Sequence, residues 1–235
     1  MLKYQFDWSV VTSGQYLGWL VDGLRLTLEL SAVACVAAFV LGLLVAMLRM
    51  SPLAPIRWLA QAYLEFFRNT PLLIQIFFWY FGAYEVFPER FNDWLNQWDF
   101  EFAAAAIALT IYTSAFIAED IRSGIRAIPK EQMEAARSQG FGFMGAMRHV
   151  ILPQAVRNTI PPLTGQFLNA TKNSSLAMTI GVAELTYQAR QIESYTFKGL
   201  EAFSAATLVY LTISLGITAL VMLYDKRVLS PARAR

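Results

Sequence analysis

The sequence feature that most limits the possible folds is a series of long stretches that are almost free of charge. Residues 30–48 carry no charge, and a helix of these nineteen residues is about 28 Å long, close to the hydrocarbon thickness of a bilayer. Four further apolar stretches follow along the chain. We therefore expect an all-α polytopic membrane protein, a single transmembrane domain over residues 1–235, with spans at about residues 24–48, 71–87, 102–118, 161–182 and 202–224.

The composition agrees with a membrane protein. The 235 residues are 56% hydrophobic with a mean hydropathy of +0.42, and a soluble domain would not carry several long uncharged stretches. The one cysteine, Cys35, lies inside the first stretch, so no disulfide framework is possible. The first ten residues lack an apolar core followed by a small-residue cleavage site, so we expect no cleavable signal peptide.

Lysine and arginine are unevenly distributed between the connecting segments. With the C-terminus placed inside, the inner segments hold 13 of the 19 basic residues and the outer segments hold 4, while Arg25 and Lys172 fall within or near spans. Inner segments of membrane proteins carry an excess of basic residues. The sequence therefore predicts that the N-terminus lies outside and that the C-terminus lies in the cytoplasm.

The longest inner segment, at about residues 122–157, has the pattern of two short helices joined by a bend. Residues 131–139 are rich in helix formers, and Gly140 is expected to end this first helix. Pro153 is expected to end the second helix. An apolar face on the second helix is formed by Phe141, Phe143, Met144 and Met147. Such a knob on the cytoplasmic side can dock in a groove of a partner protein.

Signatures of catalysis are not found in the sequence. Gly140, Gly142 and Gly145 match the dinucleotide fingerprint G-x-G-x-x-G, but their flanks are helical where that fingerprint needs a strand and a βαβ unit. The phosphate-loop pattern of ATPases is missing, and His149 has no companions at metal-ligand spacing. We expect no catalytic residues, no metal and no cofactor on this chain, and no nucleic-acid partner, because topology explains the basic residues.

The inner segment also carries fixed positions that resemble a known motif. Glu134-Ala135-Ala136 is followed after three residues by Gly140, and after nine more by Val150-Ile151-Leu152-Pro153. This resembles the EAA motif of permease subunits in binding-protein-dependent ABC importers, with Val150 where the pattern has isoleucine. Residues 67–73, FRNTPLL, resemble the entry to the second span of polar amino-acid permeases. The similarity is greatest to glutamate/aspartate permease subunits, on residues 16–19, 172–174 and 179–181.

The polar group at residues 171–175 lies within the expected fourth span. Counted from a helix start at Pro161, Lys172 is about 16 Å along the helix and near mid-membrane, where a charge is costly unless it faces a cavity or a partner. In one interpretation Lys172 attracts a substrate carboxylate and its neighbours supply hydrogen bonds. In the other it pairs with Glu119, Glu184 or an acid of a partner chain.

Candidates for a substrate path are therefore Lys172, Asn173, Ser174 and Ser175, with Gln166 and Thr113 as weaker ones. Serine and threonine hydroxyls in helices often bond their own backbone instead.

The resemblance implies a type I ABC importer permease fold, with five spans and cytoplasmic coupling helices. It implies alternating access, with a periplasmic binding protein delivering substrate and two ATPase subunits holding ATP and Mg. It also implies a second permease subunit, a related but different chain, and a place in the lipid bilayer of the bacterial inner membrane, with the N-terminus in the periplasm and the C-terminus in the cytoplasm. Residues implied to couple to the ATPase are Glu134, Ala135, Ala136, Gly140 and Phe141. The resemblance favours glutamate/aspartate as the substrate, with glutamine or basic amino acids as the alternative substrates. A self-sufficient channel or secondary transporter is the alternative from a different class of protein.

Overall fold

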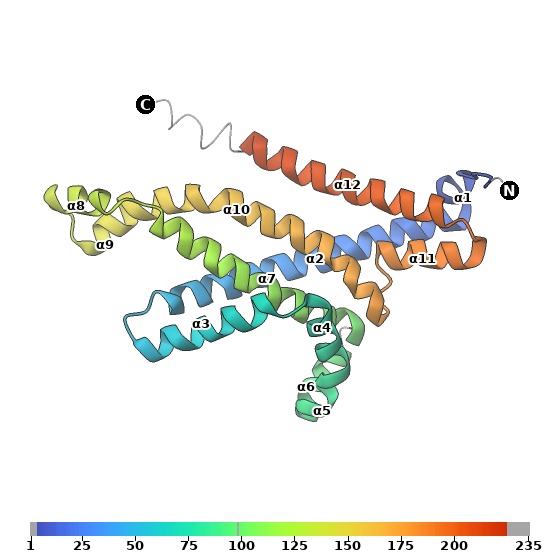
Figure 1. Ribbon diagram of the computed structural model, residues 1–235, viewed down its shortest axis with the longest axis horizontal. Helices are drawn as coiled ribbons and strands as arrows, with labels where there is room; N and C mark the ends of the chain where they lie inside the picture. Colours follow the sequence, from blue (N-terminus) through green and yellow to red (C-terminus); the bar gives the residue numbers. More distant parts are fainter. Residues whose placement is uncertain (1–3, 98, 225–235) are drawn as a thin grey trace. The chain divides into compact units, whose positions relative to one another are not determined.

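The computed structural model describes residues 4–97 and 99–224, and this part of the chain is helical without a β-strand (Figure 1). Two of its segments, η1 and η2, are π-helices, and η3 is a 3₁₀ helix. The elements in chain order are α1 (Ser9–Thr12), α2 (Gly14–Arg49), α3 (Ala54–Asn69), α4 (Leu72–Phe77), η1 (Phe78–Gly82), α5 (Ala83–Val86), α6 (Glu89–Asn96), α7 (Phe100–Arg126), α8 (Lys130–Ser138), α9 (Phe143–Ala146), η2 (Met147–Ile151), α10 (Leu152–Asn173), η3 (Ser174–Ile180), α11 (Leu185–Thr196) and α12 (Gly199–Tyr224).

Three of the expected spans form helices that are long and apolar enough to cross a bilayer, namely α2, α7 and α12. Each extends beyond its predicted bounds; α2, for example, begins at Gly14 where the first span was expected near residue 24. The expected second span forms α4, η1 and α5, in which Leu72–Gly82 is a shorter apolar helix. The fold class predicted from the sequence is confirmed, while the count of five spans stays a prediction.

The helix of the expected fourth span begins earlier than predicted. It starts at Leu152 and contains Pro161 and Pro162, so the prediction of a start near Pro161 is wrong. The prediction that Pro153 ends the preceding helix is also wrong, because η2 passes directly into α10 and Pro153 is the second residue of α10. Prolines are tolerated inside membrane helices because neighbouring groups satisfy the carbonyls that they leave free.

The chain divides into two compact units. Unit 1 consists of Met1–Cys35, Pro71–Leu109 and Leu168–Leu220, and unit 2 consists of Val36–Thr70, Thr110–Phe167 and Val221–Arg235. Because the boundaries fall within helices, α2, α7 and α10 each contribute residues to both units.

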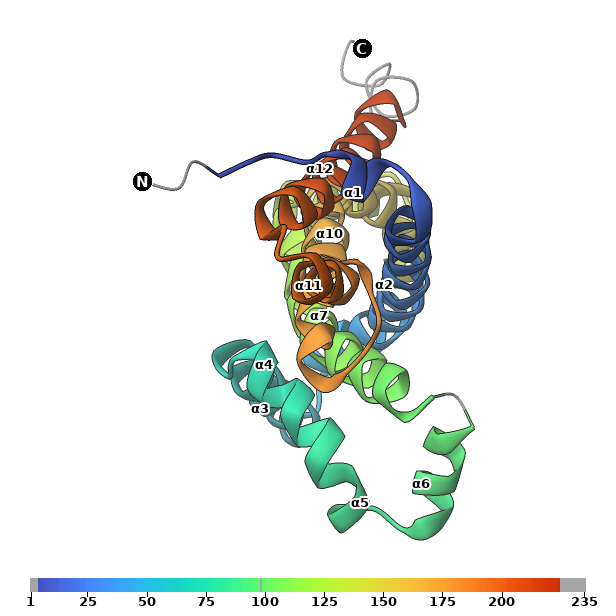
Figure 2. The same ribbon diagram turned by 90° about the vertical axis from the view of Figure 1, so that its right-hand side faces the viewer.

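The core of unit 1 is formed where α1, α2, α11 and α12 meet (Figure 2). The buried side chains come from all four helices, and α11 contributes three of them. They are Val11, Leu20, Leu185, Ala189, Ile192, Ala202 and Ala206. Alanines on α11 and α12 let the helix backbones approach closely, as small residues do in membrane helix packing.

α2 and α11 approach each other closely at Gly23. A Cβ atom at this position would lie 2.9 Å from the Cα atom of Leu185 and 2.8 Å from Cγ of Gln188. The backbone contact cannot be relieved by a rotamer change, so we expect Gly23→Leu to lower the free energy of unfolding by about 1–3 kcal/mol, as overpacking does. The measurement is the melting temperature of the detergent-purified chain. The control is Gly18→Leu on the same helix, where no atom lies within 4 Å of the new Cβ, and it is expected to leave the melting temperature unchanged. An equal fall in melting temperature in both variants would contradict the close packing at Gly23.

The segment before α1 is tied to the start of α12. Glu201 is fully buried, and its carboxylate accepts hydrogen bonds from the Tyr4 hydroxyl and from the Asp7 N–H at 2.8 Å. The Lys198 ammonium donates to the Gln5 carbonyl and lies 5.2 Å from the centre of the Tyr4 ring. These contacts hold together parts of unit 1 that are far apart in the sequence.

The core of unit 2 is formed by α2, α3 and α7. Its buried side chains are Ala38, Val45, Ala46, Ala60, Leu64, Ile117, Ala118 and Ile121. The Tyr63 hydroxyl of α3 lies 2.7 Å from Ser114 Oγ and donates to the Ile111 carbonyl at 3.0 Å, which fixes α3 to α7. Trp58 and Leu59 of α3 are exposed, as expected for a helix in contact with lipid.

Candidate functional site

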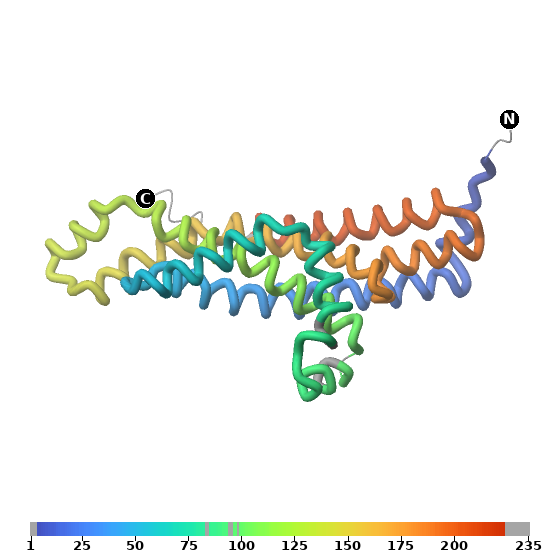
Figure 3. Tube along the Cα trace, turned by 60° about the horizontal axis from the view of Figure 1, so that its bottom comes forward, coloured from blue at the N-terminus to red at the C-terminus, as the bar shows by residue number. Residues whose placement is uncertain are grey.

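The predicted coupling segment forms a helical hairpin in unit 2, drawn in yellow-green in Figure 3. Its first arm, α8, presents Glu134 and Ala135 to solvent and buries Ala136, whose side chain is 4% exposed. Gly140 has φ +90°, and the helix is closed by bonds from the Gly140 N–H to the Arg137 carbonyl and from the Phe141 N–H to the Ala136 carbonyl. The prediction that Gly140 ends this helix is confirmed.

The second arm, α9 and η2, displays an apolar surface. Phe143 and Met144 are 61% and 74% exposed, and Phe141, in the bend before α9, is 38% exposed with its ring 6.0 Å from that of His149. Met147–Ile151 forms a π-helix, a form that often occurs at functional sites. An exposed carboxylate at Glu134 beside exposed apolar side chains is the chemistry of a docking knob that fits a groove in a partner.

Lys172 lies in the last turn of α10, in unit 1, and its side chain is exposed. Measured from the observed helix start, it is about 30 Å along α10, not the 16 Å counted from Pro161. Within the described residues its ammonium has no ion pair and no hydrogen bond. This exposed cation on a helix of a membrane protein needs a counter-charge from substrate, partner or solvent.

The two carboxylates considered as structural partners of Lys172 are engaged elsewhere. Glu119 pairs with Arg122 on the same helix, with Nε donating to Oε2 at 2.9 Å. Glu184 is fully buried and accepts hydrogen bonds from the N–H groups of Thr186 and Tyr187 and from the Tyr210 hydroxyl, at 2.7–3.0 Å. Burial raises the pKa of the Glu184 carboxyl, and these hydrogen bonds oppose that rise.

The neighbours of Lys172 use their polar groups locally. Ser174 is fully buried and donates to the Thr171 carbonyl at 2.8 Å, and Ser175 donates to the Lys172 carbonyl at 2.7 Å. Asn173, the last residue of α10, is half-buried. The hydroxyls therefore bond their own helix, the alternative that the sequence had left open.

The two weaker path candidates lie in unit 2. Gln166 on α10 donates from Nε2 to Asp120 Oδ2 on α7 at 2.8 Å, and Thr113 on α7 is buried with 3% of its surface exposed. Asp120 was not among the predicted site residues. The signal that could have identified it is its position seven residues after Thr113, on the same face of a helix in which most residues are apolar.

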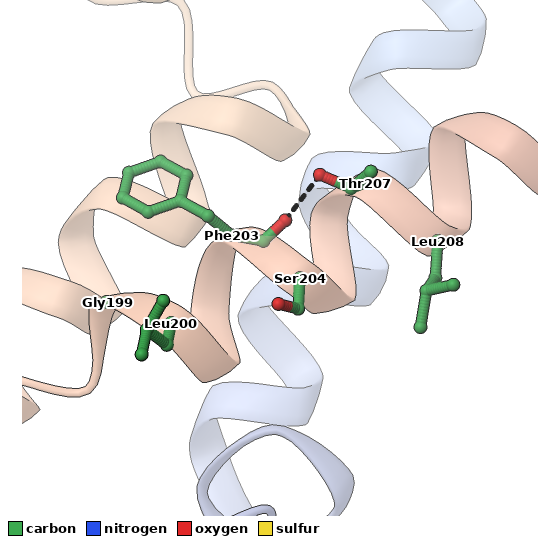
Figure 4. Close-up of a pocket in the computed structure, with 6 residues that line it drawn as sticks. All are labelled: Gly199, Leu200, Phe203, Ser204, Thr207 and Leu208. Carbon is green, nitrogen blue, oxygen red and sulfur yellow. Dashed lines mark hydrogen bonds between the residues drawn. The ribbon is translucent and has the colours of Figure 1, made fainter. Parts of the chain in front are cut away.

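A hollow of about 490 Å³ lies along α12 in unit 1 and is lined by that helix alone (Figure 4). Its lining residues are Gly199, Leu200, Phe203, Ser204, Thr207 and Leu208, and the Thr207 hydroxyl donates to the Phe203 carbonyl. No charged residue and none of the predicted path residues lines it. Groups of His, Cys, Asp and Glu that could hold a metal ion are not found among the described residues.

Residues 38–230 match the family described as binding-protein-dependent transport system inner membrane component, so the chain belongs to this family of ABC transporter permease subunits. Permeases of the family cross the bacterial inner membrane and work with ATPase and binding-protein partners. They are not themselves catalytic.

Similar proteins and structures agree with this assignment. The chain is 44% identical over 207 residues to the probable glutamine ABC transporter permease protein GlnM of Bacillus subtilis (strain 168), covering 88% of this chain and 92% of that protein. It is 34% identical over 220 residues to the glutamate/aspartate import permease protein GltJ of Escherichia coli (strain K12), covering 92% and 89%. The crystal structure of an amino acid ABC transporter with histidines matches with a TM-score of 0.84 and 34% identity, covering 96% and 100%.

Proposed function

We propose that the chain is one of two permease subunits of an ATP-driven importer that carries glutamate or aspartate by alternating access. The observation that carries the proposal is Lys172, an exposed cation near the end of α10 without a partner in the described part of the chain. An ammonium group in a membrane helix attracts a carboxylate. GltJ, a glutamate/aspartate import permease, supports the acidic substrate.

The exposed positions of α10 in unit 1 support a polar path. Asn169 and Lys172 are exposed and lie three residues apart on α10, so they lie on one side of that helix. α10 is also not among the helices apolar enough to face lipid all round. A polar side on a helix of a membrane protein faces water or a partner, which is the environment that a translocated amino acid requires.

Coupling to ATP hydrolysis is assigned to the hairpin of α8, α9 and η2. Its residues Glu134, Ala135, Ala136, Gly140 and Phe141 would seat in a groove of an ATPase subunit, with ATP and Mg held by that partner. Two ATPase copies, a periplasmic binding protein and a related second permease complete the importer. The basic inner segments support a periplasmic N-terminus and a cytoplasmic C-terminus.

Glutamine is a second candidate substrate, because GlnM and the glutamine transport system permease protein GlnP of Escherichia coli (strain K12) are 44% and 34% identical to this chain. A lysine that binds the α-carboxylate would serve glutamate and glutamine alike. We expect labelled glutamate uptake by cells that carry the importer to be competed by excess aspartate more strongly than by excess glutamine. The reverse order would assign glutamine. If neither glutamine nor aspartate competes, and the cells take up lysine or arginine, the substrate would be assigned to the basic amino acids.

The composition of the importer is tested by gentle purification of the chain from its native membrane, followed by mass spectrometry. We expect an ATPase with a phosphate loop and a second, related permease to copurify. The ATPase without a second permease would indicate a homodimer. Neither of them, in a preparation shown to be intact, would overturn the proposal in favour of a self-sufficient channel or secondary transporter.

A further inference from the structure

The helix changes its form directly after Lys172. η3 follows α10 without a break and is a 3₁₀ helix of seven residues. A single 3₁₀ turn is common at the C-terminal end of an α-helix, but stretches longer than about three or four residues are uncommon. This stretch lies directly after the proposed substrate-binding lysine, which suggests that its helical form affects the direction of the Lys172 side chain.

The packing of η3 fits the 3₁₀ form. Its buried residues are Ser174, Ala177 and Ile180, at 0%, 0% and 5% exposure, which are spaced by three. Residues three apart lie on one line along a 3₁₀ helix, whereas along an α-helix these three would spread over about 120°. The neighbours of η3 in unit 1 are α4 and α11. Packing against them is thus matched to three residues per turn.

The hydroxyl groups of η3 follow the same spacing. Ser174, Ser175 and Thr179 each donate to the carbonyl three residues back, at 2.8, 2.7 and 2.7 Å. In the α-helical part of α10 the corresponding bonds reach four residues back, from Thr159 to Ala155 and from Thr164 to Ile160. The Ser175 bond is the one that reaches the Lys172 carbonyl itself.

The far end of η3 is anchored. Gly181 has φ +98°, and the N–H groups of Gly181 and Val182 bond the carbonyls of Met178 and Ala177. Beyond it, the buried Glu184 is hydrogen-bonded to Tyr210 of α12, and the Leu185 N–H donates to Thr27 Oγ1 of α2 at 3.1 Å. With this end fixed, a change of η3 to an α-helix would shorten it by about 3.5 Å and turn Lys172 by about 140°.

We propose that Ser174 and Ser175 are positioning residues whose hydroxyls hold η3 in the 3₁₀ form and so set the direction of Lys172. The inference rests on the proposed function, in which Lys172 meets the substrate carboxylate. Loss of the hydrogen bonds from these hydroxyls lets η3 change toward the α-helical form, and this change turns the Lys172 ammonium group away from its position.

The test measures the position of residue 172 without requiring transport. In the complete importer in membranes, with Cys35→Ala, the variant Lys172→Cys is labelled with a membrane-impermeant thiol reagent. Adding Ser175→Ala is expected to change the labelling rate at least about threefold, since residue 172 turns about the helix axis and faces different surroundings. Ser175→Thr keeps a hydroxyl, and Thr164→Ala deletes an equivalent bond in the α-helical part; both are expected to leave the rate unchanged.

Transport gives a second readout with Lys172 present. Ser175→Ala is expected to lower the maximal uptake rate, and Ser175→Thr is expected to restore it. An unchanged labelling rate in both Ser175→Ala and the Ser174→Ala/Ser175→Ala double variant would overturn the inference, as would an equal change in Thr164→Ala. Failure of the proposed function would appear separately, as normal uptake by Lys172→Met, and would leave the labelling result as it stands.

Discussion

Replacement of Glu134 by lysine is expected to abolish substrate-stimulated ATP hydrolysis by the purified importer. Glu134 is exposed on the first arm of the coupling hairpin, so its loss removes no internal contact of the chain. Reversal of a charge at a docking position opposes association and is expected to lower the stimulated rate at least about tenfold. The measurement is the release of phosphate by the reconstituted complex with and without the substrate-loaded binding protein.

A matched control is available on the same helix. Glu131→Lys makes the same change of charge one turn away at another exposed position, outside the EAA pattern, and is expected to leave stimulation largely intact. The amount of chain in the membrane shows that Glu134→Lys still folds. Full stimulation of ATP hydrolysis in Glu134→Lys would refute the docking assignment. An equal loss of stimulation in both variants would indicate a general effect of surface charge instead of docking at Glu134.

Replacement of Lys172 by methionine is expected to lower uptake of acidic amino acids at least about tenfold, because the attraction between ammonium and carboxylate is lost where water is scarce. Methionine keeps the length of the side chain, and Lys172 has no partner among the described residues whose group would be left unpaired. The complex is therefore expected to assemble normally. The measurement is initial uptake by cells at limiting substrate, together with copurification of the subunits.

Two further variants sharpen this result. Lys172→Arg keeps the charge and is expected to retain part of the uptake. Lys198→Met removes another basic residue of unit 1, one that bonds the Gln5 carbonyl, and is expected to leave uptake near normal. Loss of assembly in Lys172→Met would favour a structural role with an acid of the partner chain, and normal uptake would exclude the substrate role.

The fold could be predicted from the sequence where local pattern decides the structure. Long apolar stretches gave three helices that can cross a bilayer, and Gly140 ended its helix because the backbone there adopts a conformation that favours glycine. The start of α10 was missed because Pro161 and Pro162 indicate a helix start in most contexts, but here lie inside the helix.

The candidate site could be predicted only in part, for a similar reason. The coupling hairpin is a local structure, and the spacing of its residues was sufficient to identify it. The partners of Gln166 and Glu184 were not predicted, because Asp120 and Tyr210 lie 46 and 26 residues away along the chain and meet them only through helix packing. The change from α-helix to 3₁₀ helix at Ser174 likewise depends on which side of the segment is buried.

The attachment of residues 4–7 to Glu201 has a consequence for biogenesis. The hydrogen bond from the Asp7 N–H joins residues 194 positions apart, so it can form only after the start of α12 has left the ribosome and been inserted. Until then residues 4–7 of the nascent chain cannot bind the Glu201 carboxylate. Protection of residues 4–7 from added protease therefore reports that the start of α12, made much later, is in place.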